Sequence, residues 1–109
     1  MKVIVLPEVQ QHLDSLKKVL FELEYFGFED SAQRYVDELF DDIATTLPIR
    51  LHKSAPKYFE KYGKNMEYAG FRKNKNTMWY VFFTRYWENG EEIYLIRYIS
   101  NNHMIAQYL

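Results

Sequence analysis

Three runs of aromatic and β-branched residues stand close together between residues 66 and 103. Such residues suit a pleated, half-buried surface, so each run predicts a β-strand. The dipeptide Asn89-Gly90 separates the second run from the third and tolerates the positive φ angles of a tight two-residue turn. The segment 74–76 (Asn-Lys-Asn) is a weaker turn signal between the first two runs. The pattern therefore predicts a three-stranded antiparallel meander.

The first 48 residues change to a helical pattern after a short apolar strand at Lys2–Leu6. Pro7 suits the first position of a helix, where its missing N–H is not needed. Apolar residues then recur at steps of three and four in two stripes, Val9, Leu13, Leu16, Leu20 and Leu23, then Ala32, Tyr35, Val36, Leu39, Phe40, Ile43 and Leu47. We predict that Gly27 ends the first helix, that Asp30 or Ser31 caps the second, and that Pro48 ends it.

Together these elements predict one α+β domain over residues 1–109, an N-terminal strand and an α-helical hairpin packed on a mainly antiparallel sheet. Five apolar residues of the hairpin should be buried against the sheet: Leu16, Leu20, Val36, Leu39 and Ile43. The stretch 49–65 shows no clear periodicity, and either a functional loop or a helical turn with a solvated lysine face fits it. Near the C-terminus we expect a short helical turn that packs Met104, Ile105 and Leu109.

Charge is unevenly distributed along the chain. Residues 1–48 carry a net charge of −6 and the remainder carries +5. An acidic half and a basic, aromatic half suggest an anionic partner for the second half, although two solvated faces of unequal charge would give the same count. No apolar run approaches the roughly 20 residues of a membrane helix, and the N-terminus lacks a signal-peptide pattern, so a cytoplasmic protein without membrane contact is expected.

Basic residues recur inside the predicted strands, where they are costly unless exposed or used. They make the meander the place to expect a site, at Arg72, Lys73, Arg85 and Arg97. Alternation places Arg97 on the same side as Ile93, Leu95 and Ile99, so it is either paired or at the rim of a site. The chain has no cysteine and no metal-ligand spacing or glycine-rich phosphate loop, so neither a metal nor a cofactor is expected.

The order and spacing of several short patterns resemble the RelE/ParE superfamily of type II toxin–antitoxin toxins. These patterns cover nearly the whole chain: Leu6-Pro7-Glu8, Ala32 with Tyr35, Gly70-Phe71-Arg72, the run 80–83 (Tyr-Val-Phe-Phe) and the run 93–99 with Arg97. Many members follow the last strand with a histidine and then an arginine, whereas this chain has Ser100-Asn101-Asn102-His103. That departure puts the usual chemistry at the end of the strand in doubt.

The resemblance implies a cognate antitoxin as partner and one of two targets. The ParE branch inhibits DNA gyrase, and the near-zero net charge and the helical hairpin look more like this branch. The RelE branch cuts messenger RNA on the ribosome and would use cations near the phosphate and an acid or base beside them. A non-toxic binding module on the same fold is a third alternative, and a homodimer and a toxin–antitoxin hetero-oligomer are both open.

If the chain is a ribonuclease, the catalytic candidates are Arg72, Arg97, Tyr98 and His103. Arginine grips phosphate through two hydrogen bonds, histidine changes charge near neutrality, and tyrosine stacks on bases. Further contacts to phosphate or target would come from Lys73, Lys75 and Arg85. Each arginine could instead pair with an acid such as Glu67, Glu91 or Glu92, and the ion pair is the favoured interpretation for Arg85.

Overall fold

The computed structural model describes residues 2–22 and 29–109, without the side chains of residues 16–22, 29–32 and 74. Its chain runs through β1 (Lys2–Val5), α1 (Pro7–Glu22), α2 (Glu29–Thr46), β2 (Lys53–Ser54), β3 (Glu67–Asn74), β4 (Thr77–Glu88), β5 (Glu91–Asn101) and α3 (Asn102–Ile105). Short 3₁₀ turns lie at η1 (Leu47–Ile49), η2 (Lys57–Tyr62) and η3 (Ala106–Tyr108). The predicted α+β class is confirmed.

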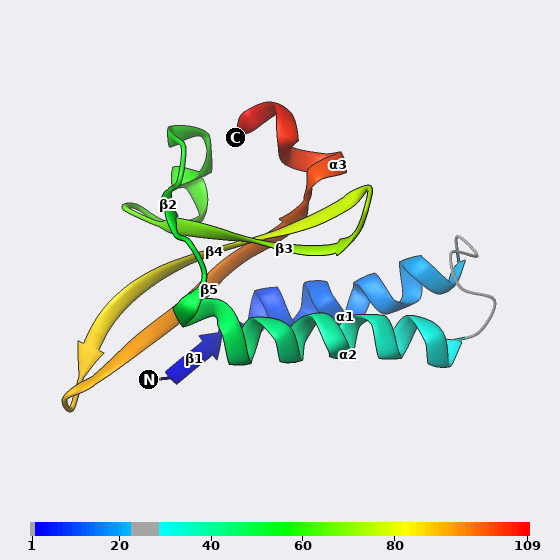
Figure 1. Ribbon diagram of the computed structural model, residues 1–109, viewed down its shortest axis with the longest axis horizontal. Helices are drawn as coiled ribbons and strands as arrows, with labels where there is room; N and C mark the ends of the chain where they lie inside the picture. Colours follow the sequence, from blue (N-terminus) through cyan, green and yellow to red (C-terminus); the bar gives the residue numbers. More distant parts are fainter. Residues whose placement is uncertain (1, 23–28) are drawn as a thin grey trace.

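One five-stranded sheet has the order β1-β5-β4-β3-β2. β1 runs parallel to β5, and the other neighbours are antiparallel, so the sheet is mixed but mostly antiparallel. The N-terminal strand therefore joins the sheet beside the last strand of the meander. Such a parallel connection needs a crossover, and the α1–α2 hairpin supplies it on one face of the sheet (Figure 1).

The helical hairpin packs on the sheet as its apolar stripes predict. Val36, Leu39 and Ile43 are at most 2% exposed and belong to the main core. Their partners on the sheet are Ala69, Phe71, Trp79, Val81, Phe83, Tyr94, Ile96 and Ile99. The predicted burial of these three residues is confirmed. The stop at Gly27 lies outside the described residues, and so do the side chains on which the predictions for Leu16, Leu20 and the caps Asp30 and Ser31 depend.

The two turns of the meander lie where the sequence places them. Asn89 and Gly90 have φ angles of 53° and 76°, which is the left-handed backbone that a tight hairpin needs. The other turn occupies residues 75–76 between β3 and β4. Because β4 and β5 are 12 and 11 residues long, their paired ends project beyond the helices as a two-stranded ribbon (Figure 1).

A second, smaller core lies on the face of the sheet away from the helices. Phe59 from η2, Met66, Phe82 from β4 and Ile105 from α3 form it, and all four are buried. The stretch 49–65 is thus anchored to the body by 3₁₀ turns and the two-residue strand β2. Of the three apolar residues expected to pack at the C-terminus, Ile105 is buried, whereas Met104 is 66% exposed and Leu109 is 39% exposed. The expected packing of Met104 and Leu109 is therefore wrong.

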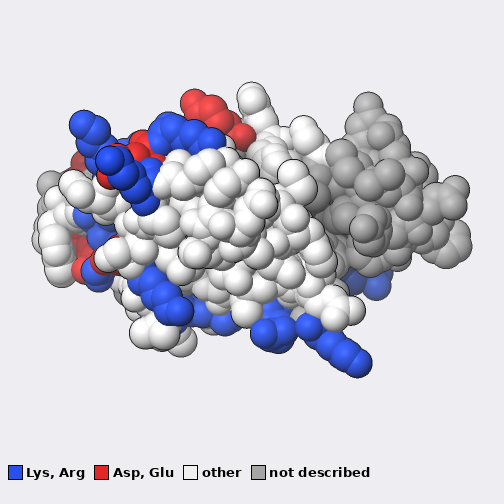
Figure 2. Space-filling model, turned by 90° about the horizontal axis from the view of Figure 1, so that it is seen from above, with Lys and Arg blue, Asp and Glu red and all other residues white. Residues whose placement is uncertain are grey.

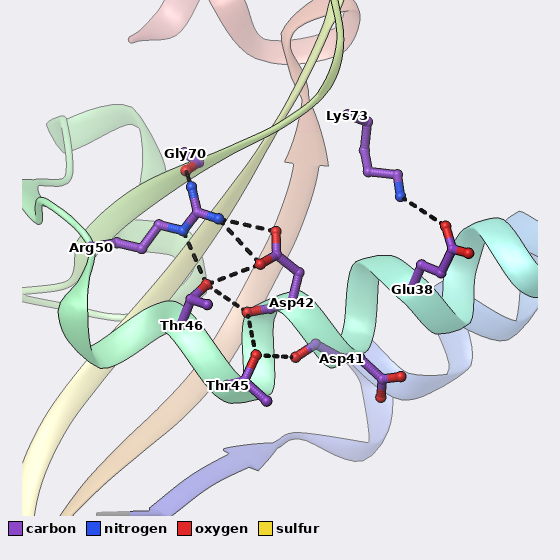
Figure 3. A network of polar contacts seen from close by, with 8 residues as sticks. All are labelled: Glu38, Asp41, Asp42, Thr45, Thr46, Arg50, Gly70 and Lys73. Atoms are coloured by element: carbon purple, nitrogen blue, oxygen red, sulfur yellow. Dashed lines mark hydrogen bonds and ion pairs between the residues drawn. The ribbon is translucent and has the colours of Figure 1, made fainter.

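Arg50 connects the end of α2 to the edge of the sheet (Figure 3). Its guanidinium donates to both carboxylate oxygens of Asp42 at 3.2 and 3.0 Å and to the backbone oxygen of Gly70 at 3.3 Å. It also lies 4.2 Å from the ring centroid of Phe71. The arginine thus satisfies an edge carbonyl of β3 while it holds the last turn of α2.

No helix among the described residues is long and apolar enough to cross a membrane.

Candidate functional site

The sheet face away from the helices is the candidate site, and a β-bulge decides what points into it. In the β4–β5 pair, Phe82 lies opposite Tyr98 but Phe83 lies opposite Ile96, so Arg97 is the extra residue. Arg97 and Tyr98 therefore both point to the face away from the helices, whereas Ile96 and Ile99 face the main core. The predicted alignment of Arg97 with Ile99 is wrong, because simple alternation does not allow for the bulge.

Arg97 is half-buried and is held by neutral groups. Its Nε donates to Thr84 Oγ1 at 3.1 Å, and none of the ion pairs between described residues includes it. Its aliphatic stem lies against Gly63, where an added Cβ would come within 2.7 Å of Arg97 Cδ. The guanidinium is thus positioned by packing while its charge is not neutralised by a carboxylate.

Tyrosines stack in two pairs on the same face as Arg97. The Tyr62 and Tyr98 rings are parallel with centroids 3.9 Å apart, and Tyr58 stacks on Tyr108 at 3.7 Å. Lys61 Nζ lies 4.1 Å from the Tyr58 centroid, and its hydrogen bond to that hydroxyl lowers the pKa of Tyr58. Burial raises the pKa of Tyr98. The cluster therefore offers flat aromatic surfaces next to fixed positive charge.

A groove continues this surface along the edge of β3. It has a volume of about 500 Å³, and two cations are among its lining residues. The lining is mainly apolar and aromatic, with Leu51, Tyr68, Met78, Tyr80 and Leu109 beside Arg50 and Lys53. Seen from this side, lysine and arginine side chains lie along parts of the margin of a largely uncharged centre, with a few acidic side chains among them (Figure 2). The face thus combines apolar and aromatic side chains with several basic residues at its margin.

Arg72, Lys75 and His103 lie at another end of the same sheet. Arg72 is exposed, and its Nη1 donates to the backbone oxygen of Lys75 at 3.3 Å. Exposed His103 has its Nε2 3.4 Å from Thr77 Oγ1, where α3 meets the β3–β4 turn. Asn102 holds this junction by accepting from Met78 N and donating to Asn76 O.

The sheet register separates these two groups. Arg72 is level with Met78 on β4, whereas Tyr98 is level with Phe82. Four residue steps along β4 amount to roughly 13 Å, and the two groups also lie on strands either side of β4. The structure therefore brings Arg97 together with Tyr98, and Arg72 together with Lys75 and His103, but it does not bring the two arginines to one phosphate-sized place.

The remaining two sequence candidates lie on the helix side. Lys73 Nζ is 3.7 Å from Glu38 Oε2 and 4.8 Å from the Tyr35 ring centroid, so it ties β3 to α2 (Figure 3). Arg85 Nη2 donates to Glu67 Oε1 at 2.6 Å. The ion pair favoured for Arg85 is thus present.

Sequence reasoning missed that His52 belongs to this last cluster. Its Nδ1 lies 3.5 Å from Glu67 Oε2, and its Nε2 lies 2.7 Å from the Leu47 backbone oxygen. It also packs edge-on against Phe83, with ring centroids 4.9 Å apart. No local pattern around His52 indicates this contact, because its partners come from β3 and β4.

Comparison of the chain with protein-family models, curated proteins and solved structures finds no match. The residue pattern and the geometry are therefore the basis for assigning a function. Among the residues that the structure describes, no group of three or more His, Asp or Glu side chains could hold a metal ion.

Proposed function

We propose that this chain is the cytoplasmic toxin of a type II toxin–antitoxin pair and that it slows growth by binding DNA gyrase. The proposal starts from the resemblance to the RelE/ParE superfamily. The order of strand, helical hairpin and antiparallel strands in the structure agrees with what that resemblance implies.

The observation that favours binding over RNA cleavage is the separation of the candidate catalytic residues. Cleavage of a phosphodiester needs a base, a cation and an acid around one phosphate. Here Arg97 and Tyr98 lie mid-sheet, Arg72 and His103 lie at the β3–β4 turn end, and Arg85 is paired with Glu67. His52 lies on the helix side, against Phe83 and Tyr94. A toxin that acts by binding does not require these groups to converge.

A ribosome-dependent ribonuclease is the second candidate, and one specific observation favours it. Arg97 and Lys61 lie beside the stacked pairs Tyr62–Tyr98 and Tyr58–Tyr108, and stacking surfaces next to cations suit single-stranded RNA. In this reading Arg97 would hold the phosphate, although the acid or base would have to come from a group other than His103.

One induction experiment tests the proposal and distinguishes the two targets. The chain is expressed alone and together with the product of an adjacent small reading frame, and growth, cleavage ends in translated messages and gyrase supercoiling in vitro are measured. We expect slowed growth, relief by the adjacent product, impaired supercoiling and intact messages. Cut messages with unimpeded gyrase would establish the ribonuclease instead, and normal growth with folded protein would favour a non-toxic module.

Arg97→Ala sharpens this test. Loss of one preorganised cationic donor from a cleavage site typically lowers the rate about a hundred- to a thousand-fold. On our proposal Arg97→Ala leaves growth inhibition largely intact, whereas on the ribonuclease reading it abolishes inhibition. Arg34→Ala, which removes an exposed cation from α2, serves as the matched control.

A further inference from the structure

Among the described residues outside the candidate site, the tip of the β4–β5 ribbon carries the most exposed aromatic side chain. Trp87 is 70% exposed and Tyr86 is 40% exposed, although both sit within a strand. Monomeric proteins seldom leave a tryptophan this open, and tryptophan and tyrosine are the residues that most often dominate protein interfaces. Residues 86–92, here named the ribbon tip, therefore have the composition and exposure of a protein interaction surface.

Charge restricts what that partner is. The ribbon tip contains three glutamates, Glu88, Glu91 and Glu92, and no lysine or arginine. Glu88 and Glu91 are directly opposite across the strand pair, an arrangement that costs stability when the charges are alike. Phosphate would be repelled here, so nucleic acid does not fit. A protein that offers an apolar pocket with a basic rim fits both the aromatics and the carboxylates.

The base of the ribbon is braced, which keeps the tip in a defined position. Glu67 on β3 pairs with Arg85 on β4, and Arg85 lies directly opposite Tyr94 on β5, whose pKa is raised by burial and influenced by Glu92 and Arg85 as its neighbours. Tyr94 itself is only 3% exposed. Three strands are thus tied together where the ribbon leaves the sheet. Because the base is held by three strands, the tip has less freedom to swing, which lowers the entropic cost of binding.

We propose that the ribbon tip is the surface that grips the protein target, with Trp87 as the central anchor and the glutamates as its acidic rim. The inference rests on the proposed function, in which that target is gyrase. It assigns target binding to the tip, away from the aromatic and basic face that contains Arg97.

The test compares Trp87→Ala with Ile49→Ala, which truncates another large apolar residue that is 80% exposed but lies on η1. Affinity for purified gyrase and growth inhibition are both measured, and thermal unfolding checks that the variants fold. We expect Trp87→Ala to weaken binding by at least about tenfold, as for an interface hot spot, and to relieve growth inhibition. Ile49→Ala should match the wild type in both measurements.

Charge reversal provides an independent arm. Glu88→Lys should weaken binding and reduce its sensitivity to salt, whereas Asp41→Lys, an equal charge change at an exposed position of α2, should alter neither.

If the wild type binds gyrase and Trp87→Ala binds it equally well, the inference is overturned while the proposed function stands. If the wild type does not bind gyrase, the proposed function fails, and the growth assay then decides the inference. If Trp87→Ala no longer inhibits growth, the tip is still the target surface. If Trp87→Ala inhibits growth as the wild type does, the inference is overturned.

Discussion

At the scale of single residues, burial and pairing decide what each charged or polar group can do. Arg97 and Arg85 lie on adjacent strands, yet the first faces neutral partners and the second is bound to Glu67. The sequence made both arginines candidates for phosphate contact, with an ion pair favoured for Arg85 and left open for Arg97. Their surroundings separate them, because a carboxylate at 2.6 Å neutralises one guanidinium and leaves the other positive.

Tyr94 should make the protein lose stability in alkaline solution. Burial raises its pKa in the folded state, whereas the unfolded phenol ionises near its ordinary value of about 10. Below that value neither state is ionised. Above it the unfolded state releases its proton first, so the free energy of unfolding falls as pH rises, by up to about 1.4 kcal/mol per pH unit.

Denaturant titrations at several pH values from about 8 to about 11, a range that brackets the ordinary pKa of a phenol, measure this loss of stability. Tyr94→Phe should flatten the decline, whereas Tyr86→Phe, which removes a more exposed hydroxyl, serves as the control. Equal slopes for the wild type and Tyr94→Phe would contradict the assignment.

At the scale of elements, a few side chains fix how the helices and strands meet. Arg50 joins α2 to the edge of β3, Lys73 joins β3 to the middle of α2, and Asn102 joins α3 to the β3–β4 turn. Each of these side chains joins two elements that are separated by other segments of the chain. These ties determine the position of the strand edge that lines the groove.

Arg50→Ala should lower the free energy of unfolding by about 1–3 kcal/mol, because it removes charge-assisted hydrogen bonds from a half-buried guanidinium. Arg50→Lys should cost less, since it keeps the charge but loses the forked contact with Asp42. Chemical denaturation of both variants, of Asp42→Ala and of the double variant measures the coupling. If the two alanine effects simply add, Arg50 and Asp42 do not interact as described.

At the scale of the whole molecule, one continuous core between the hairpin and the sheet dominates stability. Leu39 is completely buried at its centre. The smaller core under η2 and α3 holds the opposite face, so the sheet is covered in part on both sides. The ribbon tip remains outside both cores, whereas the tyrosines beside Arg97 are partly buried against the smaller one and keep only part of their surface for a partner.

Leu39→Ala should lower the free energy of unfolding by about 2–5 kcal/mol, because the truncation leaves a cavity that the rigid sheet cannot fill. Arg34→Ala on the exposed side of the same helix should change it by no more than about 0.5 kcal/mol. Thermal and chemical unfolding of the two variants gives the comparison. A loss below about 1 kcal/mol for Leu39→Ala would mean that the hairpin does not pack on the sheet as described.

The sequence by itself determined the features that depend on local period and turn chemistry. The helical stripes through Val36 and Leu39, the three strands and the turn at Asn89-Gly90 all follow from residues within a few positions of one another. It also indicated that Arg85 would be paired. These features could be predicted because neighbouring residues alone fix backbone angles and the buried side of an element.

Only the tertiary structure decided which candidate residues share a place. The bulge opposite Phe82 and Phe83 turns Arg97 toward Tyr98, and it arises from how two strands pair rather than from either strand alone. The meeting of His52, Glu67 and Arg85 likewise joins three separate segments. Such contacts depend on register and on the folding back of distant segments, and a one-residue change in strand pairing is enough to redirect a side chain to the opposite face.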